Sequence, residues 1–232
     1  MANLIFIGGT GHGGWYFDDI AAKLRALGHT VFAPHLSGLD PASNERKVVN
    51  LDTHVQDVLD VIEQNQLEEV VLVGHSYGGM VITGAADRTS AKVTGLVYLD
   101  AALPQPGQRL WDLIDADMHK SFLASATDGL NVYPDEAFLA MRPNVRPHPL
   151  ATKLQPMNYS LDIFDVPTKV YVYAEEYFGV PGMISPFEVI YNRLSQDAGW
   201  KTYSLPVGHD LLNTAPDEVF EIVKAALADI GD

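Results

Sequence analysis

The strongest structural signal in the chain is Glu69-Val70-Val71-Leu72-Val73-Gly74-His75-Ser76-Tyr77-Gly78-Gly79. Its first five residues form a short apolar run that is typical of a buried parallel strand. The G-x-S-x-G sequence that follows is the pattern of a sharp strand-to-helix turn, in which the glycines prevent clashes with neighbouring backbone. Such a turn would lift Ser76 above the strand, at a helix N-terminus that favours a developing negative charge. A glycine-rich loop that matches by chance is the alternative interpretation, and the flanking strand and helix patterns disfavour it.

The rest of the chain repeats the pattern of a buried strand followed by an amphipathic helix. Mostly apolar runs predict strands at residues 4–7, 30–33, 70–73 and 93–99, and the strand pattern resumes at 169–173 and 200–205. Apolar positions at helical spacing predict helices at residues 17–27, 55–62 and 80–86, and Pro216 opens a last helix. This alternation predicts an α/β fold, with a mostly parallel sheet of about six strands that helices cover on both faces.

One segment departs from this rhythm. Residues 104–167 are rich in proline, aromatic residues and methionine, and they contain no clear strand. We interpret approximately residues 104–167 as a helical lid that is inserted above the functional site. The 232 residues fit a single domain, 1–232, that carries this insertion.

The charge and composition exclude several classes of function. Thirty acidic and 15 basic residues give a formal net charge of −15, which disfavours nucleic acid and anionic membrane surfaces as partners. The chain has no cysteine, so disulfides, thiolate nucleophiles and cysteine metal sites are excluded. We expect no signal peptide and no membrane span, because the apolar runs are too short. A cytoplasmic protein is expected, and the sequence leaves open whether it forms a homodimer.

His209 is the candidate base that would activate Ser76. A serine hydroxyl is a weak nucleophile and needs such a base. The fold that carries this turn uses the order nucleophile, acid, histidine, and His209 lies after the last predicted strand. Of the other histidines, we expect His75 to point away from the site and His12 to help shape the first loop. We expect the remaining ones, such as His54 and His148, to be solvated or locally hydrogen-bonded.

The chain resembles the hydroxynitrile lyase and esterase branch of the α/β-hydrolase superfamily. The similarity runs over most of the chain and rests on Gly13-Gly14-Trp15, Gly28-His29, the turn around Ser76, Val97-Tyr98-Leu99-Asp100-Ala101 and Gly208-His209-Asp210. It implies a lid between the fourth and fifth strands and a serine–histidine–acid site without metal or cofactor. The lyases have a lysine directly after the histidine and a threonine in the first loop, where this chain has Asp210 and Gly9. Both departures favour the ester-hydrolysing members.

The resemblance also indicates an oxyanion hole. The tetrahedral intermediate of acyl transfer needs preorganised N–H donors, and one is expected from Tyr77, directly after the nucleophile. The family's pattern places the other at Thr10, in the glycine-rich loop after the first strand. A purely structural turn is the plain alternative. The glycine spacing over residues 8–14 also fits a dinucleotide-binding loop, but the second strand ends in Ala33-Pro34-His35, without the charged residue that such a site requires.

The acid that would orient His209 stays open between two residues. In this fold it usually follows the penultimate strand, where the expected aspartate coincides with Tyr177 and Glu176 is its neighbour. The alternative is Asp100, at the end of the strand at 93–99, a position that some superfamily members use. Asp100 is the preferred candidate and Glu176 the alternative.

The predicted reaction is acyl transfer to Ser76. We predict a serine hydrolase of the carboxylesterase or lactonase type that cleaves a small, apolar or aromatic ester, lactone or activated amide through an acyl-enzyme. The apolar residues of the predicted lid suggest that substrate class, although packing of the lid explains them equally well. The expected partner is a small-molecule substrate, and no cofactor is expected. A hydroxynitrile lyase, a cofactor-independent oxygenase and a non-catalytic binding protein are the alternatives on this fold.

Overall fold

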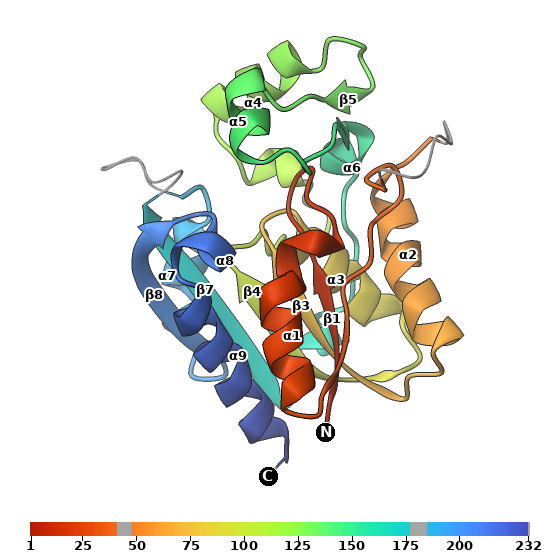
Figure 1. Ribbon diagram of the computed structural model, residues 1–232, viewed down its shortest axis with the longest axis vertical. Coiled ribbons are helices and arrows are strands. Elements are labelled where there is room, and N and C mark those ends of the chain that lie inside the picture. Colours follow the sequence, from red (N-terminus) through yellow and green to blue (C-terminus); the bar gives the residue numbers. More distant parts are fainter. Residues whose placement is uncertain (41–47, 177–184, 232) are drawn as a thin grey trace.

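A six-stranded parallel sheet forms the centre of the computed structural model, which describes residues 1–40, 48–176 and 185–231 (Figure 1). Its strand order is β2-β1-β3-β4-β7-β8, and every neighbouring pair is parallel. The strands are β1 (Asn3–Ile7), β2 (Thr30–Phe32), β3 (Glu69–His75), β4 (Lys92–Leu99), β7 (Thr168–Glu176) and β8 (Lys201–Gly208). The predicted α/β fold is confirmed, and each predicted strand is present with slightly different ends.

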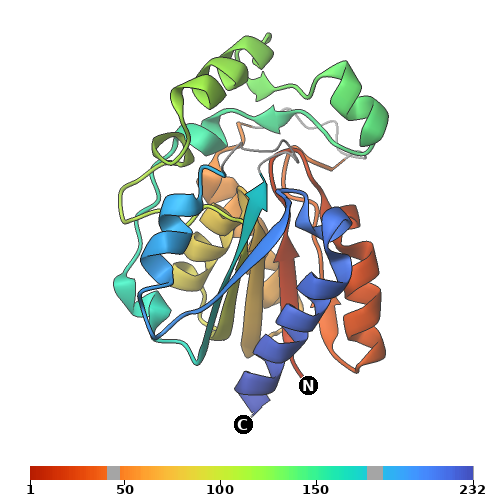
Figure 2. The same cartoon turned by 90° about the vertical axis from the view of Figure 1, so that its left-hand side faces the viewer.

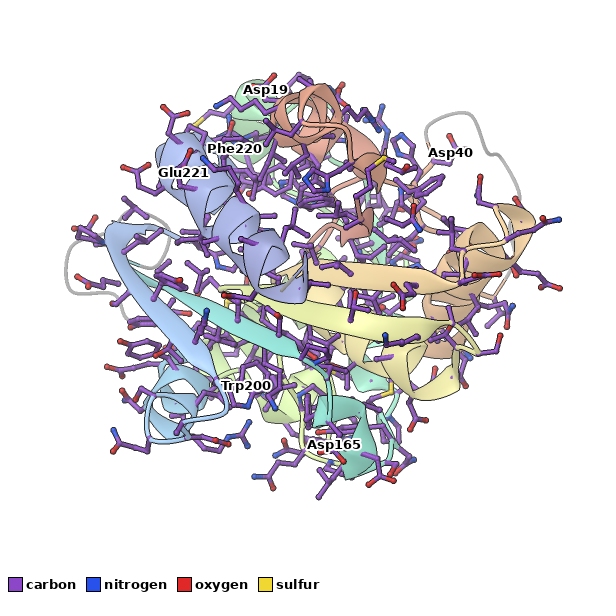
Figure 3. All side chains as sticks on the ribbon, turned by 90° about the horizontal axis from the view of Figure 1, so that it is seen from below. Asp19, Asp40, Asp165, Trp200, Phe220 and Glu221 are labelled. Atoms are coloured by element: carbon purple, nitrogen blue, oxygen red, sulfur yellow. The ribbon has the colours of Figure 1, made fainter. Side chains whose placement is uncertain are left out.

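Helices cover both faces of this sheet and make three layers (Figures 1 and 2). One face carries η1 (Gly14–Phe17), α1 (Asp18–Ala26), α8 (Leu211–Thr214) and α9 (Pro216–Gly231). The other face carries α2 (Leu51–Gln64), α3 (Gly78–Arg88) and α7 (Glu188–Leu194). Seen from below, Phe220 of α9 and Trp200 lie on opposite sides of the strands (Figure 3). No helix in the described ranges is long and apolar enough to cross a membrane.

Side chains along each strand alternate between the two helical layers. Leu4 and Phe6 of β1 pack against the α1 and α9 face, whereas Ile5 and Ile7 pack against the α2 and α3 face. All four side chains are fully buried, which stabilises the fold by roughly 1.5–3 kcal/mol each. Because both faces of the inner strands are covered, β1 and β3 read as continuous apolar runs, which is the signal that the sequence carries.

The chain between β4 and β7 lies largely outside the sheet. α4 (Ala116–Ser125), α5 (Glu136–Met141) and an antiparallel pair formed by β5 (Asn131–Val132) and β6 (His148–Pro149) lie above the carboxyl ends of the strands (Figure 1). The sequence does not predict β5 and β6, because two-residue strands leave no alternation to detect. η2 (Leu110–Asp112) packs against α6 (Ala151–Leu154), and η3 (Leu161–Phe164) packs beside α3. The single-domain organisation and the lid boundaries at 104–167 stay predictions.

Candidate active site

The turn that carries Ser76 has the predicted strand–turn–helix form, between the end of β3 and the start of α3. Ser76 adopts a φ of 55°, in the left-handed region that few non-glycine residues enter. Gly78 is required by the packing below the turn, because a Cβ there would lie 2.3 Å from the carbonyl oxygen of Ile7. The turn therefore holds a strained serine at the carboxyl end of the sheet, as expected of a nucleophile elbow.

His209 joins Ser76 to Asp100 through two hydrogen bonds. Its Nε2 lies 2.9 Å from Ser76 Oγ, and its Nδ1 lies 2.5 Å from Asp100 Oδ2. Since a carboxylate accepts hydrogen bonds, Nδ1 carries the proton and Nε2 accepts from the serine hydroxyl. Residues that lie 133 positions apart in the sequence are thus placed so that a proton can pass from oxygen to nitrogen.

Asp100 is itself held firmly at the end of β4. Its side chain is fully buried, and its backbone adopts a φ of 40°. Its N–H donates to the carbonyl of Val172 across 2.6 Å, and its carboxylate accepts from the Ser185 hydroxyl at 3.1 Å. The N–H of Ala174 donates to the same carboxylate at 3.4 Å. These donors stabilise the negative charge of the carboxylate and fix the angle at which it meets the histidine.

Glu176, the alternative acid, lies at the end of β7 opposite Gly208. Within the described residues, no hydrogen bond joins its carboxylate to His209. Tyr177, where the usual aspartate is expected, lies outside the described residues. Of the two candidate carboxylates, the structure brings Asp100 and not Glu176 to the histidine.

The loop after β1 passes directly over the serine. A Cβ on Gly9 would lie 2.8 Å from Ser76 Cβ and 3.3 Å from its Oγ, so only glycine fits opposite Ser76. Nδ1–H of His12 donates to the Thr10 carbonyl across 3.0 Å. The N–H groups of Thr10 and Tyr77, the two predicted oxyanion donors, donate no hydrogen bond to another residue in the described part of the chain. Two backbone donors near Ser76 are therefore available to a ligand.

The expectation that His75 points away from the site is wrong. Its ring lies beside that of His209, with centroids 4.8 Å apart, and its Nε2–H donates to the His209 carbonyl across 2.9 Å. Alternation along β3 turns the His75 side chain to the α1 face, where Tyr16 packs against it. Burial lowers the pKa of His75 well below its usual value, so it stays neutral and acts as a fixed support for the histidine loop.

His54 and His148 are both fully buried, so neither is solvated. Nε2 of His148 lies 2.9 Å from Thr152 Oγ1, four positions along the chain, which is the expected local hydrogen bond. Nδ1 of His54 accepts from the Tyr77 hydroxyl at 2.9 Å, and burial lowers the pKa of His54 to about 4. Nδ1 of His148 accepts from the Gly11 N–H at 3.1 Å, which ties β6 to the loop over the serine. Tyr77 lies 23 positions from His54 and Gly11 lies 137 positions from His148, so only the folded chain brings these partners together.

Three further polar residues near the site escape sequence reasoning. Ser185 donates to Asp100, Arg142 forms an ion pair with Asp210, and Lys153 is buried beside Thr10. They lie in segments without periodicity, and their partners are more than sixty positions away, so no local pattern marks them. Among the described residues, no cluster of three or more histidine, aspartate or glutamate side chains could hold a metal ion.

Comparison with known proteins identifies the family. A model of the alpha/beta hydrolase family matches residues 4–222. The chain is 37% identical over 246 aligned residues to carbendazim hydrolyzing esterase of Nocardioides sp., covering 97% of this chain and 99% of that protein. It is 38% identical over 96 residues to alpha-hydroxynitrile lyase of Arabidopsis thaliana, covering 40% of this chain and 37% of the lyase. An extracellular alpha/beta-hydrolase from a Paenibacillus species has the same fold, with a TM-score of 0.82 at 22% identity over 97% of this chain and 99% of that one. The chain belongs to the alpha/beta hydrolase family, in the branch of esterases and hydroxynitrile lyases, and it is an ester-cleaving hydrolase.

Proposed function

We propose that this hydrolase is a serine esterase that works through an acyl-enzyme, with Ser76 as nucleophile, His209 as general base and Asp100 as the acid. The observation that carries the proposal is the unbroken hydrogen-bond path from Ser76 Oγ through His209 to Asp100. In the first step Oγ attacks the ester carbonyl carbon while Nε2 of His209 takes the serine proton. The same nitrogen then gives that proton to the departing alkoxide, which leaves as the alcohol. A water molecule that His209 deprotonates releases the carboxylic acid and restores the serine.

Asp100 contributes by keeping the imidazole in the useful tautomer. Its carboxylate accepts from Nδ1–H, so Nε2 is left unprotonated and faces the serine hydroxyl. When His209 takes the serine proton, the buried carboxylate stabilises the resulting imidazolium.

The N–H groups of Thr10 and Tyr77 are the proposed oxyanion donors. Three contacts support this assignment, because they fix the loop before any substrate arrives: His12 holds the Thr10 carbonyl, His148 holds the Gly11 N–H, and the Gly11 carbonyl accepts from the Arg146 N–H. Tyr77 directly precedes α3, whose N-terminal dipole favours negative charge. Donors that need no rearrangement stabilise a tetrahedral intermediate most effectively.

The proposed substrate is a small, apolar or aromatic ester, with lactones and activated amides as further candidates. The name of the relative that acts on carbendazim supports this class and makes carbendazim a direct candidate. The position after the histidine, where the lyases have lysine, is held by Asp210, which is paired with Arg142. That pairing supports the esterase over the lyase. A cytoplasmic location and the absence of nucleic-acid and membrane partners remain proposals from composition and charge.

The decisive experiment compares single substitutions at the three residues on one set of substrates. Wild type, Ser76→Ala, His209→Ala, Asp100→Asn and Glu176→Gln are assayed on p-nitrophenyl acetate, p-nitrophenyl butyrate and carbendazim, and labelling by a fluorophosphonate probe is measured. We expect kcat to fall about 10⁴-fold or more in the first three variants, with labelling lost in Ser76→Ala. Glu176→Gln serves as the matched control and should keep wild-type turnover.

Two results would overturn the proposal. Full ester turnover by Ser76→Ala would rule out an acyl-enzyme on Ser76. Full turnover by Asp100→Asn, together with loss of turnover in Glu176→Gln, would assign the acid to Glu176 instead. Thermal unfolding of each variant shows whether a loss of rate reflects the chemistry or the fold.

A further inference from the structure

Lys153 is a buried amine beside the loop that passes over the serine. Its side chain on α6 is fully buried, and its Nζ donates to Thr10 Oγ1 across 2.7 Å. Nζ also lies 4.8 Å from the ring centre of Phe122 in α4 and 5.2 Å from that of Tyr77. No carboxylate in residues 1–40, 48–176 or 185–231 forms an ion pair with it. A lysine buried among rings without a counter-charge is strongly unfavourable for stability, so this position requires a reason.

The polar groups around Lys153 do not supply the missing negative charge. His54 on α2 and His148 on β6 are both neutral at neutral pH, because burial lowers their pKa values, and the positive charge of Lys153 lowers them further. Burial raises the pKa of Tyr77 far above its usual value, so its hydroxyl keeps its proton. The acidic residue of η2, which packs against α6, is Asp112, and it is paired with Arg109. In its protonated form the lysine therefore has no paired carboxylate among the described residues before substrate binds.

The hydrogen bond to Thr10 connects this charge to the reaction centre. Because Thr10 Oγ1 accepts from Nζ, its own hydroxyl proton is left to donate, and it donates to no other described residue. Thr10 follows Gly9, which lies in contact with Ser76, and its N–H is one of the proposed oxyanion donors. A charge placed here acts over a short path that begins at a fully buried amine, where electrostatic effects are larger than in bulk solvent.

We propose that Lys153 is a positioning residue of the oxyanion hole, which uses the Thr10 hydroxyl to bring positive charge to the tetrahedral intermediate. The inference rests on the proposed function, since it needs an oxyanion next to Ser76. The developing negative oxygen supplies the counter-charge that the resting site lacks. An ester carbonyl has no such charge, so the interaction strengthens in the transition state and not in the bound substrate.

The first test is a kinetic comparison of Lys153→Met with wild type on p-nitrophenyl acetate, a neutral ester. Methionine keeps an unbranched apolar chain that is one heavy atom shorter than lysine, and it removes the charge. We expect kcat to fall about 10- to 100-fold while KM changes less than about twofold, the pattern of an interaction made in the transition state. Lys169→Met is the matched control, because that lysine bonds the Phe164 carbonyl at the opposite end of β7, and it should keep wild-type kinetics.

A double-mutant cycle tests whether the lysine acts through Thr10. Thr10→Val keeps the backbone N–H and removes the hydroxyl, so we expect a fall in kcat similar to that of Lys153→Met. In the Thr10→Val background, Lys153→Met should then cost less than about a further twofold, because the path is already broken. Thr10→Ser keeps a hydroxyl and should recover most of the lost rate.

These experiments test two claims separately: the role of Lys153 and the serine mechanism on which it rests. Unchanged kcat in Lys153→Met, losses that multiply across the cycle, or an increase in KM alone would overturn the role of Lys153. A lower melting temperature in Lys153→Met that tracks its loss of rate would also overturn it, because it would assign the lysine to the fold. Fluorophosphonate labelling of Ser76 separates these outcomes from failure of the proposed esterase mechanism. If only the lysine inference is wrong, Lys153→Met is still labelled. If the serine mechanism is wrong, wild type itself is not labelled.

Discussion

Ser76 and Asp100 both hold positive φ angles, and both touch His209. Each such angle costs roughly 1–3 kcal/mol at a non-glycine residue, so the surrounding structure must impose it. For Ser76 the packing of Gly78 against β1 does so, and for Asp100 the hydrogen bond from its N–H to Val172 does so. The two strained residues aim their side chains at one imidazole from neighbouring strands, β3 and β4.

Gly9 gives the sharpest prediction at this scale. Gly9→Ala places a methyl group 2.8 Å from Ser76 Cβ, so the serine or the loop must move. We expect kcat/KM for p-nitrophenyl acetate to fall at least about tenfold, because small displacements of a nucleophile are costly. Gly199→Ala, in a surface turn, is the control and should leave kinetics unchanged. Wild-type activity in Gly9→Ala would show that the loop does not constrain Ser76, the proposed nucleophile.

The loop after β8 is tied to the elements around it by Asp210. Its Oδ1 accepts from the Tyr16 hydroxyl at 2.7 Å and from Asn213 at 2.8 Å, and its Oδ2 is paired with Arg142 at the end of α5. Since His209 precedes Asp210, these bonds hold the histidine loop between η1 and the segment above the sheet. Burial of Asp210 opposes its ionisation, but the bonds from Arg142, Asn213 and Tyr16 prevail and lower its pKa to about 2.

This pKa predicts how the loop contributes to stability as pH changes. An aspartate whose pKa falls from 3.8 to about 2 on folding stabilises the protein above pH 3.8, and the contribution is lost as pH falls toward 2. Asp210→Asn should therefore melt about 2–4 °C below wild type at pH 7, for a partly exposed pair worth on the order of 1 kcal/mol. Calorimetry at pH 7, 4 and 2.5 should show the difference in melting temperature between wild type and Asp210→Asn closing toward low pH. Asp117→Asn, at an exposed residue of α4, is measured alongside as the reference for removing a surface carboxylate. A gap that widens toward low pH would contradict the assignment.

The elements differ in how far the sequence predicts them. Strands such as β3 are buried on both faces and appear as apolar runs, and Ser76 directly follows β3. His209 directly follows β8, an edge strand whose residues are mostly half-buried or exposed. Asp100 also follows a strand, but the sequence could not separate it from Glu176, because the choice depends on which strand end lies under the imidazole. Lys153 and His148 were beyond prediction, since their roles come from contacts with Thr10 and Gly11 that cross the chain.

At the scale of the whole molecule, the net charge is −15, so carboxylates that could pair with a buried lysine are plentiful. Acidic residues outnumber basic ones two to one, yet none in the described part of the chain is paired with Lys153. Burial lowers the pKa of Lys153 to about 7, against a usual 10.5. Its neighbours His54, His148 and Tyr77 do not titrate between these values, because burial moves all three pKa values away from that window.

The difference between the folded and the usual pKa of Lys153 predicts that this residue lowers the stability of the protein by an amount that depends on pH. Between pH 7 and 10.5 Lys153 holds its proton in the unfolded chain and has released it in the folded chain. The free energy of unfolding of wild type therefore rises with pH over this range, relative to a variant that lacks the amine. The melting temperature of Lys153→Met minus that of wild type should therefore be largest at pH 7 and below, and should decrease steadily toward pH 10. The lost hydrogen bond to Thr10 adds only a constant offset, so the slope carries the test. Thermal unfolding at pH 6, 7, 8, 9 and 10 measures it. A difference that is flat across this range would mean that Lys153 keeps its usual pKa in the folded protein. The burial of an unpaired positive charge beside Thr10 would then lose its support.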